Sequence, residues 1–209
     1  MSDWQVLQIV ALASLLAWAS GIRLYLTVFA VGLAGYLGYI ELPEALRVLQ
    51  HPWVLGAAGV MLVMEFLVDK VPALDSAWDA IHTFIRIPAG ALLAAGATGD
   101  SLTALTVAAG LLGGTITAGT HFTKAGGRAV INTSPEPVSN WGASFTEDAL
   151  VLGVVWFSLE HPQAAAAIAG VLLLVGLVLL LLLGRLARRG WHRWKRRGYS
   201  EQEPVRDVS

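Results

Sequence analysis

Apolar runs constrain this chain more than any other feature of its sequence. Seven of them, separated by short polar or glycine-containing breaks, cover residues 5–20, 24–40, 53–68, 80–97, 102–122, 143–158 and 164–184. A helix needs about 20 residues to cross the hydrocarbon core of a bilayer, with a range of roughly 17–25. Because a lipid-exposed backbone must satisfy its own hydrogen bonds, these runs predict an all-α, polytopic transmembrane helical bundle with about six to seven membrane segments.

The composition also indicates a membrane protein. The chain is 56% apolar and only 14% charged, with a mean hydropathy of +0.63, whereas a soluble domain usually carries about 25% charged residues. It contains no cysteine, which excludes disulfides, thiolate metal sites and cysteine nucleophiles. The first ten residues lack the basic segment of a secretory signal, so the first run is expected to remain in the mature protein.

A small-residue break, Ser20-Gly21-Ile22-Arg23, separates the first two runs. One continuous helix over both runs would be too long for a single span. The break therefore predicts either two spans joined by a tight turn or a re-entrant half-helix followed by one span. Such a break at membrane depth is tolerated where protein or a water-filled cavity covers it.

Basic residues predict the orientation of the chain. Seven of the 14 lie between Arg185 and Arg197, so the positive-inside rule places the tail, residues 185–209, in the cytoplasm and makes residues 1–184 the transmembrane domain. Counting back puts the breaks after residues 68 and 122 on the same side, whereas Arg47 falls on the opposite one. We therefore expect a multi-pass protein of a bacterial inner membrane with a cytoplasmic C-terminus.

The tail itself predicts contact with lipid. Two tryptophans among basic residues suit an anchor on anionic lipid, at about 1 kcal/mol per basic residue near the surface. The residues of this anchor are Arg188, Arg189, Trp191, Arg193, Trp194, Lys195, Arg196 and Arg197. The last residues are polar and are expected to be disordered. Neither nucleic acid nor a cofactor is expected as a partner, and a homodimer is compatible with a chain of this size.

A weak internal repeat relates two parts of the chain. Glu65-Phe66 is followed by a Ser-Ala-Trp sequence, and His121-Phe122 is followed by Ser-Asn-Trp, each with Ala and Thr at matching offsets. The pattern predicts two repeated helical hairpins, at about 53–97 and 104–158, with chance similarity as the alternative. Pseudo-symmetric repeats with a binding site between them are typical of transporters.

Ionisable residues gather next to the apolar runs in both hairpins. Such groups are costly at the edge of a hydrocarbon layer, so a dense group of them requires an explanation. The candidates for a substrate or ion pathway are Glu65, Asp69, Asp79, His82, Arg86, His121, Glu147 and Asp148. This set could bind a hard cation through oxygen ligands or pass protons along a carboxylate–histidine chain, and which metal, if any, it binds is left open.

Other charged residues have a simpler interpretation. Lys70, Asp75, Lys124, Arg128 and Glu136 are interpreted as loop charges at the water interface. The depth of Glu65 and Arg86 within their runs allows either a structural ion pair between helices or a working site, and both alternatives stay open.

Two longer motifs resemble a known family. They are E-F-x-x-D-K-x-P-x-x-D-x-x-W-D, from Glu65 to Asp79, and T-F-I-R-x-P-x-G, from Thr83 to Gly90. At these motifs, and at the Ser20-Gly21 break, the chain resembles a group of small bacterial integral membrane proteins catalogued only as a domain of unknown function. The resemblance covers roughly residues 10–160. It implies the membrane architecture and no activity.

Three functional hypotheses follow from these observations. The first is a transporter or channel for a small solute or ion with a cytoplasm-facing polar cavity. The second is a structural or assembly protein whose polar residues pair helices. The third is a membrane enzyme that acts on a lipid-linked substrate, suggested by the spacing of Asp75 and Asp79, although the second acidic motif of such enzymes is missing.

Overall fold

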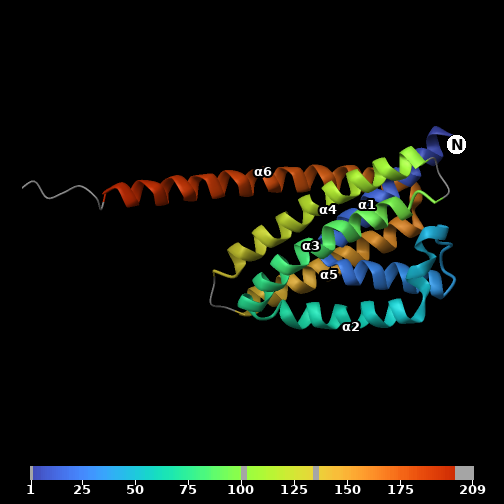
Figure 1. The fold of residues 1–209 in the computed structure, drawn as a ribbon, viewed down its shortest axis with the longest axis horizontal. Coiled ribbons are helices and arrows are strands. Elements are labelled where there is room, and N and C mark those ends of the chain that lie inside the picture. The colour runs from blue at the N-terminus through green and yellow to red at the C-terminus, as the bar shows by residue number, and fades with distance from the viewer. Residues whose placement is uncertain (1, 100–102, 134–136, 201–209) are drawn as a thin grey trace, which may run out of the picture.

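The described part of the chain is helical throughout its regular structure. A computed structural model describes residues 2–99, 103–133 and 137–200. The helices, in chain order, are α1 (Asp3–Tyr36), the 3-10 helix η1 (Glu44–Gln50), α2 (Pro52–Val68), α3 (Pro72–Gly96), α4 (Thr103–Ile131), α5 (Pro137–Glu160) and α6 (Pro162–Ser200). They lie side by side in an elongated bundle, and α6 extends far beyond the other helices (Figure 1). The predicted all-α bundle is confirmed.

Local sequence signals explain where the helices begin. The Ser2 hydroxyl accepts a hydrogen bond from the Gln5 backbone N–H, and the Gln5 side chain accepts one from the Ser2 backbone, which forms a capping box at the start of α1. Helices α2, α3, α5 and α6 all begin at a proline. Proline suits the first helical position because its missing N–H would have no intrahelical partner there.

Helix α1 is broken at Arg23, whose backbone angles (φ −140°, ψ 79°) are not helical. A straight helix would hold Gln8 and Val31 about 35 Å apart, at 1.5 Å per residue. Both residues nevertheless line one apolar pocket, so the second half of α1 folds back beside the first. Figure 1 shows that α1 starts and finishes at the end of the bundle where η1 lies, and that its tip stops inside the bundle. The predicted break is therefore confirmed, and α1 has the form of a helical hairpin, which fits both two spans joined by a tight turn and a re-entrant half-helix.

Small residues permit the closest helix contacts. A Cβ built on Gly113 of α4 would lie 2.3 Å from the Cβ of Ala94 in α3, and one built on Gly21 would lie 1.8 Å from the Thr120 hydroxyl oxygen. The contact between α3 and α4 is the most extensive in the bundle, whereas α2 touches α3 little and α4 touches α5 little. The tightest packing therefore joins the two predicted hairpins to each other, and their origin by duplication stays a prediction.

The apolarity of the helices identifies a membrane protein. Among the described residues, α1, α4 and residues 164–186 of α6 are long and apolar enough to cross a bilayer. The bent pair formed by η1 and α2, at 66°, would add a fourth span. Helices α3 and α5 have 25 and 24 residues, and they carry many of the charged groups described below.

Candidate functional site

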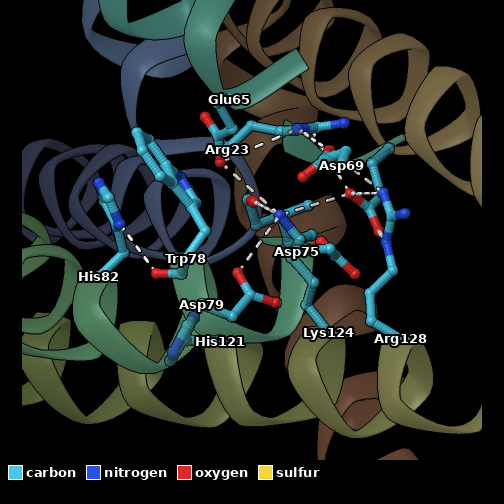
Figure 2. Close-up of polar contacts among 12 residues, drawn as sticks. Arg23, Glu65, Asp69, Asp75, Trp78, Asp79, His82, His121, Lys124 and Arg128 are labelled. Carbon is cyan, nitrogen blue, oxygen red and sulfur yellow. Dashed lines mark hydrogen bonds and ion pairs between the residues drawn. The ribbon is translucent and has the colours of Figure 1, made fainter. Parts of the chain in front are cut away.

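Ionisable side chains from five helices meet inside the bundle, near the tip of the α1 hairpin. We call this group the charged network, and its members are Arg23, Glu65, Asp69, Asp79, Arg86, Lys124, Arg128, Glu147 and Asp148. Figure 2 shows the charged ends of the labelled members, Arg23, Glu65, Asp69, Asp79, Lys124 and Arg128, directed into one region between the helices. All have side chains at most 6% exposed except Glu147 and Asp148, at 18% and 22%, which form the open edge of the network.

Arg23 lies at the tip of the hairpin and is fully buried. Its guanidinium pairs with Asp69 at the end of α2, and its Nε lies 2.8 Å from an Asp148 carboxylate oxygen of α5. It also donates to the Ser144 hydroxyl at 2.7 Å. The hairpin is thus held at its tip by ion pairs with the end of α2 and with α5, and by charge-assisted hydrogen bonds to Ser144 of α5.

Arg86 of α3 joins α2 to α3 and α4. It pairs with Glu65 of α2 through a short contact, and its Nη1 donates to Asp79 Oδ1 at 3.0 Å. The same nitrogen lies 3.2 Å from Nδ1 of His121. Glu65 and Arg86 are both fully buried, as their positions within apolar runs of the sequence suggested.

Lys124 and Arg128 of α4 were interpreted as loop charges, and this interpretation is wrong. Lys124 donates to the Ile22 carbonyl at 3.1 Å, where it caps the first half of α1, and Arg128 holds Glu147 with two hydrogen bonds of 2.9 and 3.0 Å. Helix α4 continues to Ile131, well past the apolar run that ends at residue 122, so both cations lie on a packed helix face. Their spacing from His121, three and seven residues, would have indicated a common face.

The three other residues that the sequence placed at the water interface lie in different environments. Asp75 is also buried, because α3 begins at Pro72, ahead of the apolar run. Lys70 is partly exposed, with its ammonium 3.1 Å from the centre of the Phe66 ring. Glu136 lies outside the described residues.

The hydrogen-bond partners of the two histidines constrain their protonation. An arginine can only donate, so His121 Nδ1 accepts from Arg86, and Nε2 carries the proton directed at the Thr83 hydroxyl, 2.7 Å away. His82 Nδ1 faces the Trp78 carbonyl at 2.9 Å and must donate, so in neutral His82 the Nε2 atom accepts from the Tyr25 hydroxyl at 3.0 Å. His121 therefore adds no positive charge to the site in this arrangement.

Carboxylates outnumber cations in the site only when its two partly exposed members are counted. The buried residues Glu65, Asp69, Asp75 and Asp79 face four buried Lys or Arg cations, and the partly exposed Glu147 and Asp148 bring the carboxylates to six. Several carboxylate oxygens, among them Oε2 of Glu65 and Oδ1 of Asp69, accept no hydrogen bond from the described residues. A buried charge without a partner is expensive, and proteins commonly avoid the cost by binding a proton.

The described residues show no preformed metal site. No group of three or more His, Asp or Glu side chains in the described ranges is arranged to hold a metal ion. Four pockets among the described residues are lined mainly by apolar side chains, and none of these four is lined by a member of the charged network.

The structure brings together all the predicted pathway residues except His82, which lies beside the network. His82 stacks on Trp78, with ring centroids 4.0 Å apart, at one side of the group (Figure 2). Sequence reasoning missed Arg23 as a member, although its position in the helix break was a signal. In the tail, Arg188 and Arg189 are exposed, and the side chains from residue 190 onward are outside the described part.

Comparison with known proteins gives one match. A family model described as a domain of unknown function (DUF4126) matches residues 10–183. No curated protein and no solved structure matches the chain.

Proposed function

The chain belongs to the family described as a domain of unknown function (DUF4126), and we propose that it moves a small solute or ion across the membrane. The observation that carries this proposal is the helical hairpin of α1, whose tip places Arg23 in the charged network. Broken helices that end at a site inside the bilayer are characteristic of secondary transporters. Intramembrane ionisable groups mark ion and proton pathways in many membrane proteins.

The charge of the network supports transport over a purely mechanical role. Apolar side chains of similar volume often hold helices together as well as buried ion pairs do, or better. A network that links five helices and has more carboxylates than cations can instead change its contacts when a proton or an ion enters. The pathway we propose runs from the partly exposed Glu147 and Asp148 to Glu65, Asp79 and Arg86.

The proposed setting is the inner membrane of a bacterium. The end of the bundle where α2 meets α3 and α4 meets α5 would face the cytoplasm together with the basic extension of α6. That extension would contact anionic lipid through the exposed Arg188 and Arg189. A homodimer remains a prediction from the sequence.

The test is flux in liposomes that contain the purified protein. A potassium gradient with valinomycin sets the voltage, and an enclosed pH dye reports protons, which serve as the first probe. Glu65→Gln and Arg86→Ala should each abolish the flux while folded protein remains in the membrane. The matched controls are the exposed Glu44→Gln and Arg47→Gln, which should keep it. Wild-type flux of protons, sodium and chloride in both folded network variants would overturn the proposal.

A second candidate, a structural or assembly protein, is favoured by a different observation. Each member of the network takes part in at least one ion pair between helices or within one, so the network can join helices without a ligand. In that case Glu65→Arg or Arg86→Glu alone should lower the abundance of the protein in the membrane. The double variant, Glu65→Arg with Arg86→Glu, should restore abundance even if it transports nothing.

A further inference from the structure

Asp75 differs from every other buried carboxylate of the site. It lies in the first turn of α3 and is fully buried, yet no Lys, Arg or His nitrogen of the described residues lies within ion-pair distance of it. Its Oδ2 accepts a hydrogen bond of 2.9 Å from the side-chain amide of Asn132. Its Oδ1 is buried and accepts no hydrogen bond from the described residues. A charge at this position would therefore lack a direct counter-ion.

The groups that face Asp75 do not supply that counter-ion. Arg128 of α4 favours a negative charge there, but its guanidinium is committed to Glu147 and Asp69. Asp69 at the end of α2 and Asp79 one turn along α3 both oppose it by like-charge repulsion. The N-terminal end of α3 favours an anion by only a fraction of what an ion pair contributes.

The partner of Asp75 suits both of its protonation states. A lysine or arginine would hold a carboxylate in its charged form, because these side chains can only donate. The amide of Asn132 carries both a donor and an acceptor, so it can donate to a carboxylate and accept from a carboxylic acid. The same amide nitrogen also donates to the hydroxyl of Ser76, the residue that follows Asp75 in α3, at 3.2 Å.

We propose that Asp75 is the proton-binding site of the charged network, and that protons are the ion that this protein takes up. The geometry of Asp75 supports its identification as the proton-binding residue. The role of that proton in transport rests on the proposed function. A proton from water binds one carboxylate oxygen and leaves a neutral carboxyl group. The excess of carboxylates over cations then falls by one, and the repulsion on Asp69 and Asp79 is removed.

The proton site can be tested separately from transport. In the purified full-length protein, the carbonyl stretch of protonated carboxyl groups is followed by infrared spectroscopy while pH is raised. Asp75→Asn should remove one titrating carboxyl signal that the wild type shows. Asp3→Asn, which changes an exposed carboxylate in the first turn of α1, should leave that signal unchanged.

A second variant keeps the test valid if Asp75→Asn does not fold. Asn132→Ala retains the carboxyl group and removes its amide donor, so the signal should titrate at higher pH than in the wild type. A signal that persists in folded Asp75→Asn, or that is unmoved in Asn132→Ala, would overturn the assignment. If the signal behaves as expected but wild-type liposomes pass no protons, Asp75 still binds a proton and the claim that protons are the transported ion fails. If the same liposomes also pass neither sodium nor chloride, the transport proposal fails while the proton site stands.

Discussion

The contact between α3 and α4 makes a quantitative prediction for Gly113→Ala. The new Cβ would lie 2.3 Å from the Cβ of Ala94 and 3.2 Å from the carbonyl oxygen of Gly90. Carbon atoms in contact are about 3.5–4.0 Å apart, so the two helices must separate locally by about 1 Å. Overpacking of this kind costs about 1–3 kcal/mol, and replacing glycine within a helix returns about 1 kcal/mol. The net change is a loss of up to about 2 kcal/mol in the free energy of unfolding.

Gly127→Ala is the matched control, because it lies in the same helix and its Cβ would enter open space, with no atom of another described helix within 4 Å. It should raise the free energy of unfolding by about 1 kcal/mol. Both variants are compared by equilibrium unfolding in mixed micelles with increasing sodium dodecyl sulfate, followed by circular dichroism. The difference in the free energy of unfolding between the two variants gives the cost of the steric clash between α3 and α4. Equal stability of the two variants would refute the close approach of α3 to α4.

Two further predictions concern α1. Arg23→Gln leaves Asp148 without a cation among the described residues and leaves Asp69 with Arg128 alone. The free energy of unfolding should therefore fall, by up to about 3–5 kcal/mol in the same assay, and a loss below about 1 kcal/mol would contradict the pairing at the tip. Because the chain has no cysteine, single cysteines report its topology. Trp4→Cys and Tyr39→Cys should both react with an impermeant maleimide added to intact cells, and Val138→Cys only after permeabilisation; labelling of the first two from opposite sides would refute the helical hairpin.

The helices themselves were largely predictable from the sequence. Apolar runs identified every long helix, and the small-residue break identified the kink at Arg23. The ends of α3 and α4 were not recognised, because both helices continue through polar segments that look like loops when hydropathy alone is considered. The prolines at residues 72 and 137 and the helical spacing of the charged residues were signals for these ends.

The site was predictable only in part. Glu65 and Arg86 stood out because they lie inside apolar runs, where a charge is costly whatever surrounds it. Asp75 and Lys124 did not, because burial of a residue near a helix end depends on which helices cover it. The neutral form of His121 was also beyond the sequence, since it depends on which atoms face the ring nitrogens.

The sequence by itself determined a membrane protein made of helices, with a break after the first run and charges beside the others. These properties are local, because hydropathy, helix period and capping act over a few residues. Only the tertiary structure decided that α1 folds back, and that its tip meets carboxylates from α2 and α5 more than 40 residues away in the chain. The reason is physical: close packing through glycines sets the distances between helices, and those distances select which charges can pair.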